Sequence, residues 1–301
     1  MEKPEEPHKS SLLYQVTLLG SAALWGGSYL FTKTALEAMP MHWLMCVRML
    51  GACLCMLAVF HKQIFPSLNR RIIVPGILVG LTYWGEMTTQ TIGLSTIDAG
   101  RSAFLTASYC VAVPFVTWII CAKRPALMQV AAAIVCLAGV GFVSLKTSGT
   151  TSGSAFALGL GDWLTLLCAL LCAINIVLLG IFTRRFHPIA MTFMEFLVAG
   201  ILYLVMSCLS FCGPSAAWLR PEVVSSVLFL IVGASMGAQI MENMSLPHLP
   251  SSQASIIMCT ECLFAAAFSA IFAGERFTVN TMVGFALIFT AMVMSAKCSE
   301  E

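Results

Sequence analysis

Ten apolar runs, each about as long as a bilayer is thick, constrain this chain more than any other feature of its sequence. A transmembrane helix needs about 20 consecutive, mostly apolar residues. Only 10% of the 301 residues are charged, whereas soluble globular proteins carry about 25%. We therefore expect an all-α integral membrane protein with ten transmembrane helices. The expected helices lie near residues 12–33, 41–60, 72–93, 98–120, 126–145, 161–182, 188–211, 222–244, 250–273 and 278–296.

The chain divides into two halves of five predicted helices. The longest flexible connection is the Ser-, Thr- and Gly-rich tract 147–154, near the middle of the chain. Residues 85–110 align without a gap with residues 237–262, an offset of 152 (237 − 85), and polar residues interrupt both stretches at the same place. Because each half has an odd number of helices, the second must insert upside down, which gives the inverted-repeat architecture of many secondary transporters.

This division predicts the boundaries of the parts. We expect a cytoplasmic tail over residues 1–11, a first five-helix repeat over 12–146 and an inter-repeat loop over 147–160. A second five-helix repeat follows over 161–297, and a short cytoplasmic tail over 298–301.

The distribution of lysine and arginine predicts the orientation. If the N-terminus is cytoplasmic, the cytoplasmic segments hold ten of these residues and the opposite segments hold five, which satisfies the positive-inside rule. We therefore predict a multi-pass protein of the cell membrane with both termini in the cytoplasm. The N-terminal segment shows no cleavable signal peptide, so the first helix is expected to be its own insertion signal.

Polar side chains that interrupt the apolar runs are the candidate functional residues. Glu86 and Gln90 lie one turn apart on the third predicted helix, and Gln239, Glu242 and Asn243 form a similar group on the eighth. A charged side chain at the bilayer centre costs about 2.5–3.5 kcal/mol on insertion scales. We therefore expect these residues to face a shared polar cavity. Further polar candidates within predicted helices are Arg48, Asn175, Glu195 and Glu261.

The same residues have a simpler interpretation, which stays open at this point. Polar groups in membrane bundles often only hydrogen-bond neighbouring helices, at about 0.6 kcal/mol per contact. Arg48 could pair with Glu86 or Glu195 and serve packing alone, or it could extend to the membrane interface. The threonines at positions 88, 89 and 91 are expected to contribute to contacts between helices.

Three further features have competing structural and functional interpretations. Trp25, Gly26 and Ser28 could line a pathway, or the small residues could simply allow close helix packing. Pro114 is expected to weaken or kink the fourth predicted helix. Thr278 is expected to cap the start of the tenth.

The sequence lacks the patterns of several other functional classes. It contains no GxxxxGK[ST] phosphate loop and no clustered histidines of a metal site. Most of its 13 cysteines lie inside apolar runs, where a free cysteine behaves as a small hydrophobe, and its net charge of +2 comes without a basic block. We expect no cofactor, no resident metal, no catalytic residue and no nucleic-acid partner, and therefore no enzyme.

The chain resembles the EamA-type branch of the drug/metabolite transporter superfamily. The resemblance rests on 24-LWGGSYLFTK-33, 46-CVRML-50, 90-QTIGLSTIDAGRSAFLTASYCVAVPF-115, 161-GDWLTLLCAL-170, 248-HLPSSQASIIMCTECLF-264 and 274-GERFT-278. It implies a ten-helix permease with a cavity between its halves and a small-molecule cargo that varies among members. Carried over by position, it implies a substrate site lined by Trp25, Ser28, Tyr83, Glu86, Gln90, Tyr109, Asn175, Gln239, Glu242 and Asn243. Residues with a structural or coupling charge would be Arg48, Glu195 and Glu261.

These observations together predict a secondary transporter that exports a small polar metabolite, such as an amino acid, by alternating access. The acids Glu86, Glu242 and Glu261 favour a cationic or zwitterionic cargo, or proton coupling. Two other classes stay open, an integral-membrane lipid-modifying enzyme and a non-transporting scaffold or sensor. A nucleotide-sugar carrier of an internal membrane is also open, but it would need several cavity bases to bind phosphate, and the sequence offers only Arg48 and Arg101. No pattern favours a particular oligomeric state.

Overall fold

The computed structural model describes residues 9–144, 158–210, 215–245, 248–249 and 257–297, and throughout these ranges the regular structure is helical, with no strand. The first half contains six helices, α1 (Lys9–Leu36), α2 (Met41–Ser67), α3 (Arg70–Leu94), α4 (Ala99–Ala107), α5 (Tyr109–Cys121) and α6 (Leu127–Ser144). The second half contains α7 (Leu160–Phe182), α8 (Pro188–Leu209), η1 (Ala216–Leu219), α9 (Pro221–Leu228), η2 (Phe229–Gly237), α10 (Ala238–Ser245), α12 (Glu261–Phe272) and α13 (Val279–Lys297).

Helices occupy the positions of the ten apolar runs wherever the structure describes them. By length and composition, five segments are long and apolar enough to cross a membrane. They are Met41–Ser67, Ala99–Cys121, Leu160–Phe182, Pro188–Leu209 and Pro221–Glu242. Shorter apolar helices occur within α6, α12 and α13. The first part of the expected run 250–273 lies outside the described residues, so ten complete spans stay a prediction.

Two of the expected continuous helices contain interruptions. The fourth is divided at Ser108, and Pro114 lies inside α5 rather than at the break. Proline cannot donate a hydrogen bond to the carbonyl four residues earlier. That carbonyl, of Cys110, instead accepts a hydrogen bond of 3.2 Å from the Ser295 hydroxyl of α13. Pro114 therefore leaves an acceptor that links α5 to the last helix.

The eighth expected helix changes type in its middle. Its central part, η2, is a π-helix between the α-helical segments α9 and α10. Such segments are rare and often occur at functional sites. The Ala234 carbonyl of η2 accepts a hydrogen bond from Trp25 of α1. The Ser235 hydroxyl accepts one from Arg48 of α2. The sequence analysis expected an uninterrupted helix here.

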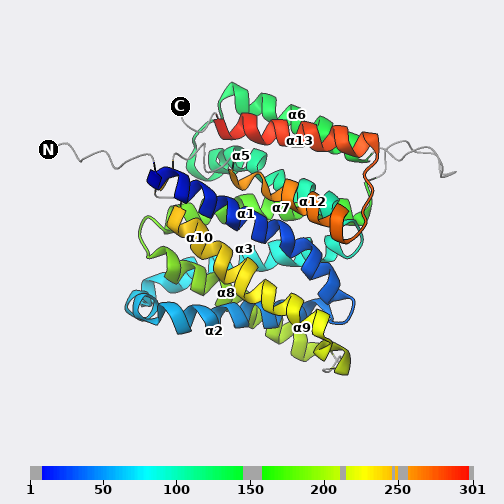
Figure 1. Ribbon diagram of the computed structural model, residues 1–301. Coiled ribbons are helices and arrows are strands. Elements are labelled where there is room, and N and C mark those ends of the chain that lie inside the picture. The colour runs from blue at the N-terminus through cyan, green and yellow to red at the C-terminus, as the bar shows by residue number, and fades with distance from the viewer. Residues whose placement is uncertain (1–8, 145–157, 211–214, 246–247, 250–256, 298–301) are drawn as a thin grey trace.

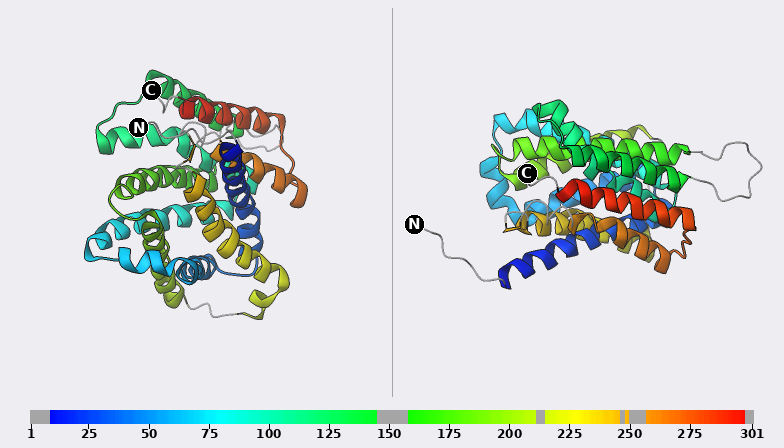
Figure 2. Two further views of the ribbon diagram at one scale, coloured as in Figure 1. Left: turned by 60° about the vertical axis from the view of Figure 1, so that its left-hand side comes forward. Right: turned by 90° about the horizontal axis from the view of Figure 1, so that it is seen from above.

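The helices pack as a single bundle in which the two halves interlock (Figure 1, Figure 2). α1 packs against η2, α10 and α12 of the second half, and α7 packs against α3, α4 and α5 of the first. α2 packs against α8 and η2, while α8 packs against α2 and α3. α4 also packs against α12, and α6 packs against α13 at one edge of the bundle in Figure 1. Exchanging the halves reproduces this pattern, which supports two related repeats; the inverted insertion of the second stays a prediction.

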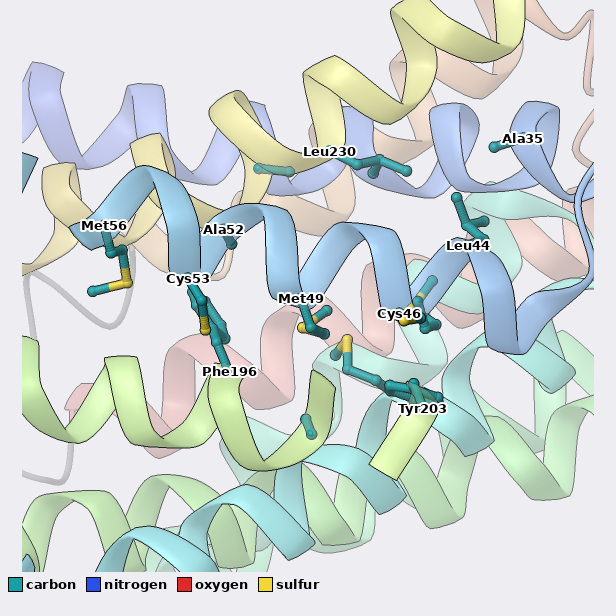
Figure 3. Close-up of a cluster of buried hydrophobic side chains, with 14 of the residues drawn as sticks. Ala35, Leu44, Cys46, Met49, Ala52, Cys53, Met56, Phe196, Tyr203 and Leu230 are labelled. Carbon is teal, nitrogen blue, oxygen red and sulfur yellow. The ribbon is translucent and has the colours of Figure 1, made fainter. Parts of the chain in front are cut away.

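The largest inter-half core lies between α2 and α8 (Figure 3). Met49 and Cys53 of α2 are buried against Phe196 and Tyr203 of α8. Cys53 is a free cysteine whose thiol donates to the Phe193 backbone carbonyl at 3.8 Å. Methionine and cysteine fill irregular space between helices well because both are soft and apolar. Here cysteine has the packing role that its position in an apolar run predicts.

Gly26 provides a direct test of the contact between α1 and α12. An alanine Cβ at Gly26 would lie 2.7 Å from the backbone oxygen of Glu261 and 2.7 Å from Cβ of Phe264. Overpacking of this kind costs about 1–3 kcal/mol. We expect Gly26→Ala to lower the unfolding temperature of the detergent-purified protein.

Gly180 of α7 is the matched control for this substitution. A Cβ at Gly180 meets nothing within 4 Å, and alanine is a better helix former than glycine by about 1 kcal/mol. Gly180→Ala should therefore leave the unfolding temperature unchanged or raise it. Equal unfolding temperatures for the two variants would contradict the close approach at Gly26.

Candidate functional site: a polar cavity between the two halves

A cavity of about 160 Å³ lies inside the bundle and is lined by residues of both halves. Glu86 and Asn175, which line it, lie inside their helices, eight residues before the end of α3 (94 − 86) and seven before the end of α7 (182 − 175). Twelve of the thirteen candidate residues of the sequence analysis line this cavity. They are Trp25, Ser28, Arg48, Tyr83, Glu86, Gln90, Tyr109, Asn175, Glu195, Gln239, Glu242 and Glu261. The thirteenth, Asn243, has a side chain outside the part of the structure that is described.

Several further lining residues were not expected from the sequence. Tyr29, Thr106, Cys172 and Ser235 add hydroxyl and thiol groups, and Phe196 adds an aromatic ring. Their types are common in apolar helices, so only the packing of the halves shows that they face the cavity. The convergence of these side chains is a geometric fact, whereas substrate binding by any of them stays a prediction.

α3 contributes Glu86 and Gln90 to the cavity. Glu86 is buried and Gln90 is partly buried, one turn further along. Gln90 donates a hydrogen bond of 3.2 Å from Nε2 to the hydroxyl of Tyr29 on α1. One side of α3 therefore presents an acid and an amide to the cavity, and α1 holds the amide in place.

The threonines of the same stretch interact mainly with helix backbone. Thr88 donates to the Trp84 carbonyl at 2.7 Å and lies 2.9 Å from the Tyr203 hydroxyl of α8. Thr89 and Thr91 donate to carbonyl groups of their own helix. Thr88 thus joins two helices as expected, while the other two hydroxyls are satisfied within α3.

Asn175 and Glu195 form the polar centre of the contact between α7, α8 and α3. The Asn175 amide donates to Glu195 Oε1 at 2.8 Å, to the Val79 carbonyl at 3.1 Å and to Thr82 Oγ1 at 3.2 Å. Both residues are buried, with exposed fractions of 5% and 4%. A neutral amide thus orients the Glu195 carboxyl group.

Arg48 is held by the π-helical segment and not by an acid. Its Nε donates to Ser235 Oγ at 3.0 Å, and its exposed fraction is 6%. Trp25 of α1 binds the adjacent residue, donating from Nε1 to the Ala234 carbonyl at 2.9 Å. Two groups expected to line the cavity therefore meet at η2.

This position decides between the interpretations of Arg48 left open by the sequence. Among the described residues, ion pairs with an N···O distance within 4.0 Å are Lys33–Asp98 and Arg101–Asp162. Arg48 is therefore not paired at that distance with Glu86 or Glu195, which corrects the expected ion pair, and its contact with a neighbouring helix is the hydrogen bond to Ser235. Its burial also excludes extension to the membrane interface in this conformation.

At α10, Gln239 and Glu242 repeat the pairing of an amide with an acid. Gln239 Nε2 donates to Glu242 Oε2 at 2.8 Å. The two residues lie one turn apart, as the sequence predicted. The second half thus contributes an oriented carboxylate to the cavity, as Asn175 and Glu195 do on α7 and α8.

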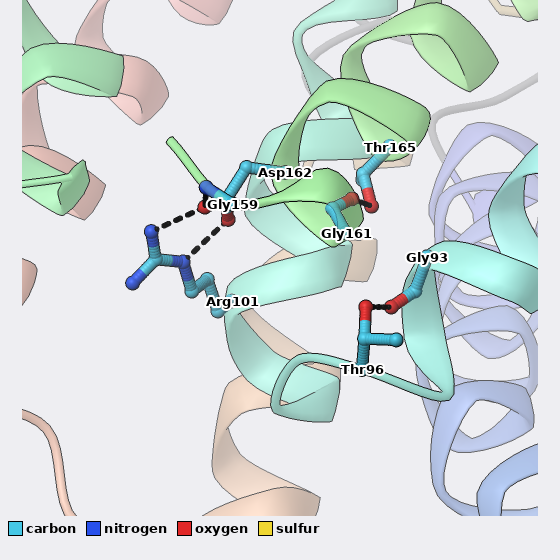
Figure 4. A network of polar contacts seen from close by, with 7 residues as sticks. All are labelled: Gly93, Thr96, Arg101, Gly159, Gly161, Asp162 and Thr165. Carbon is cyan, nitrogen blue, oxygen red and sulfur yellow. Dashed lines mark hydrogen bonds and ion pairs between the residues drawn. The ribbon is translucent and has the colours of Figure 1, made fainter. Parts of the chain in front are cut away.

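One end of the bundle, where α3 ends and α4 and α7 begin, is closed by polar contacts between the halves; we call it the Arg101 end (Figure 4). Arg101 Nε donates to Asp162 Oδ1 at 2.7 Å, and Nη2 donates to Asp162 Oδ2 at 2.9 Å. Asp162 also accepts from the Gly159 backbone N–H at 2.9 Å and so caps α7. Bidentate arginine–carboxylate pairs are among the stronger polar interactions in proteins.

A second contact at the Arg101 end involves Glu275. Glu275 Oε2 accepts a hydrogen bond of 3.2 Å from the Gly100 backbone N–H at the start of α4 and another from the Ser269 hydroxyl. A carboxylate is favourable there because the first N–H groups of a helix lack partners. The sequence analysis expected only capping within this turn, which Thr278 provides by accepting from the Thr281 N–H at 3.2 Å. The cross-half role of Glu275 was missed.

Comparison with protein families now adds to this geometry. The model of the EamA-like transporter family matches residues 12–145 and again residues 159–296. The chain belongs to the EamA-like transporter family. It is accordingly a multi-pass membrane transport protein built from two EamA repeats, and the resemblance noted in the sequence is confirmed.

Similar proteins agree with this assignment. An "Uncharacterized transporter" of Archaeoglobus fulgidus is 26% identical over 273 residues, which cover 91% of this chain and 82% of that protein. A solved chain described only as "Crystal structure of protein" superposes with a TM-score of 0.66 at 15% identity, covering 98% of this chain and all of the other. The second likeness shows the fold alone.

The Arg101–Asp162 pair should contribute measurably to the stability of this EamA protein. Asp162 is nearly inaccessible, with a side-chain exposure of 4%, so removing its partner leaves a charge with little access to water. We expect Arg101→Gln and Asp162→Asn each to lower the free energy of unfolding. A double-mutant cycle should give a coupling energy of about 0.5–3 kcal/mol.

The exposed pair Lys33–Asp98 is the control for that cycle. Its side chains are 39% and 68% exposed at a separation of 3.7 Å, and such pairs contribute about 0–1 kcal/mol. Asp98→Asn should therefore change stability less than Asp162→Asn does. Equal losses in the two variants would show that burial of the ion pair is not the source of the effect.

Proposed function

We propose that this EamA protein is a secondary transporter that exports a small polar metabolite, such as an amino acid or a related compound, across the cell membrane. The observation that carries the proposal is one polar cavity inside the helical bundle, lined from both repeats. Secondary transporters built from repeats bind their cargo near the bilayer midplane at the repeat interface. The proposal includes ten spans, an inverted second repeat and cytoplasmic termini.

The size and charge of the cavity support a small cargo. Its volume of about 160 Å³ lies below the range of about 300–1,000 Å³ of pockets that bury drug-sized ligands. Arg101, which a nucleotide-sugar carrier could have used for phosphate, is held by Asp162 and is not among the cavity-lining residues. These observations favour a metabolite exporter over a nucleotide-sugar carrier.

Alternating access in this proposal is a rocking of one repeat against the other. In the described conformation, the Arg101–Asp162 pair and the Glu275–Gly100 contact join the repeats at the Arg101 end. Access from that end would require these contacts to separate, while the α2–α8 core could act as the pivot. The polar contacts are suited to this role because water can replace them when they open.

A thermal-shift screen of the purified protein tests the proposal. A ligand that binds only the folded state raises the unfolding temperature, so we expect at least one member of a panel of amino acids, polyamines, nucleosides and sugars to do so. The same compound should then be transported by the protein in reconstituted vesicles. If no compound of the panel raises the unfolding temperature and the reconstituted vesicles show no flux, a non-transporting role is favoured.

A native cysteine pair allows a test of repeat movement. Cys110 of the first repeat and Cys259 of the second have sulfur atoms 3.7 Å apart, and a disulfide needs about 2.05 Å. Oxidation by copper–phenanthroline should join them with little movement and reduce transport at least ten-fold, because the repeats can no longer separate there. Reduction should restore the flux.

The Cys110→Ser variant is the control for this cross-link. Its transport should be insensitive to the same oxidant, which separates the effect of this pair from that of the other cysteines. Full transport by protein in which the Cys110–Cys259 disulfide has formed would show that the repeats do not separate at this point during the cycle.

Proton coupling is part of the proposal and has its own test. We expect a pH gradient across reconstituted vesicles to drive flux, and Glu86→Gln or Glu242→Gln to remove the dependence on the gradient, because an amide cannot carry the proton. Gln239, which donates to Glu242, provides a control as Gln239→Glu, which keeps an ionisable group on α10. Unchanged gradient dependence in both glutamine variants would exclude these two residues from the coupling.

A further inference from the structure

The charge of the cavity is strongly unbalanced. Four carboxyl side chains line it, Glu86 on α3, Glu195 on α8, Glu242 on α10 and Glu261 on α12, against a single cationic side chain, Arg48. Even if Arg48 compensated one acid in full, three would remain (4 − 1 = 3). A buried carboxyl group in a region of low dielectric constant either takes up a proton or needs a positive partner, so four such groups in one cavity require a chemical explanation.

Among the described residues, the hydrogen-bond donors to these acids are neutral groups. Glu195 accepts from the amide of Asn175 and Glu242 from that of Gln239. Glu86 is approached by the Cys172 thiol and Glu261 by the Tyr29 hydroxyl. Arg48 directs its Nε to the Ser235 hydroxyl instead. These hydrogen bonds orient the carboxyl groups but supply no positive charge, and Arg48 acts on Glu86 only by electrostatic attraction from beyond ion-pair distance.

The acids also act on one another across the cavity. Glu86 lies within electrostatic range of Glu195 and Glu261, and Glu242 within range of both Glu195 and Glu261. Glu86 belongs to the first repeat and the other three to the second. A positive group placed between them would therefore be attracted from both repeats at once.

Aromatic rings form much of the rest of the wall. Trp25, Tyr29, Tyr83, Tyr109 and Phe196 all line the cavity. Their positions are fixed by contacts on the protein side. Trp25 is bound to the Ala234 carbonyl, and the rings of Tyr83 and Phe196 have centroids 5.6 Å apart. The face of an aromatic ring attracts ammonium groups, by about 0.5–2 kcal/mol each.

We propose that the cargo bound in this cavity is a small organic cation, a primary amine or a quaternary ammonium compound. This inference rests on the proposed transport function and narrows its substrate class. Glu86 and Glu261 receive the cationic group, one from each repeat, because their carboxyl groups lack the amide partner that Glu195 and Glu242 have. The aromatic rings bind the remaining faces of the cation.

Matched ligands test this assignment on the unmodified protein. Choline and 3,3-dimethyl-1-butanol have nearly the same shape but differ in charge, as do putrescine and 1,4-butanediol. We expect at least one of the two cations to raise the unfolding temperature and to be transported in reconstituted vesicles. Its neutral partner should bind at least ten-fold more weakly. Glycine betaine and γ-aminobutyrate supply zwitterions of similar size.

Two variants locate the binding of the cation. Glu86→Gln and Glu261→Gln should each weaken binding of the preferred cation at least ten-fold while leaving binding of its neutral partner unchanged. Glu222→Gln is the control, because Glu222 is an exposed acid of α9 outside the cavity. If either cavity variant fails to fold, the comparison of matched ligands on the unmodified protein still decides the question.

The outcomes separate this inference from the proposed function. Equal binding of a cation and its neutral partner, a preference for zwitterions, or a shift produced only by Mg²⁺ or Ca²⁺ would overturn the organic-cation assignment. Transport of a neutral or zwitterionic compound would do so while leaving the exporter proposal intact. Absence of flux for every cation, zwitterion and neutral compound would overturn both.

Discussion

The exclusion of water from the membrane interior is the constraint on which this structure depends. Backbone N–H and C=O groups in hydrocarbon must find partners within the protein, which accounts for the helical architecture throughout the described residues. The same constraint applies to side chains. Acids, amides and the Arg48 guanidinium are placed where two repeats face one another, because lipid could not satisfy them. The polar cavity thus lies between the repeats because polar side chains are stable there and not in contact with lipid.

The two halves are joined by polar contacts in one place and by an apolar core in another. At the Arg101 end, an ion pair and a helix-capping carboxylate join the two halves. Polar contacts are weaker than an apolar core when water reaches them, so they suit a boundary that opens and closes. The apolar α2–α8 contact, built from methionine, cysteine and aromatic side chains, suits a boundary that stays packed.

The candidate site was predictable to the extent that a polar residue is conspicuous in an apolar run. Four acids could be recognised in this way because each interrupts an otherwise apolar stretch: Glu86, Glu195, Glu242 and Glu261. Asp162 and Glu275 could not, because both lie at helix ends, where acids are common and usually cap their own helix. Only the packing of the repeats brings Asp162 to Arg101 and Glu275 to the start of α4.

The sequence by itself determined the helical class, the positions of the helical segments, the family and the identity of most cavity-lining residues. Length of apolar run, rarity of charge and local motifs are properties of contiguous residues, and they can be read without knowing the fold. Tertiary structure alone decided that Arg48 binds Ser235 and not an acid, that η2 is π-helical, and that one end of the bundle is joined by Arg101 and Asp162. Those partners are distant in the chain, and no local pattern encodes which of several chemically suitable groups will meet across an interface between repeats.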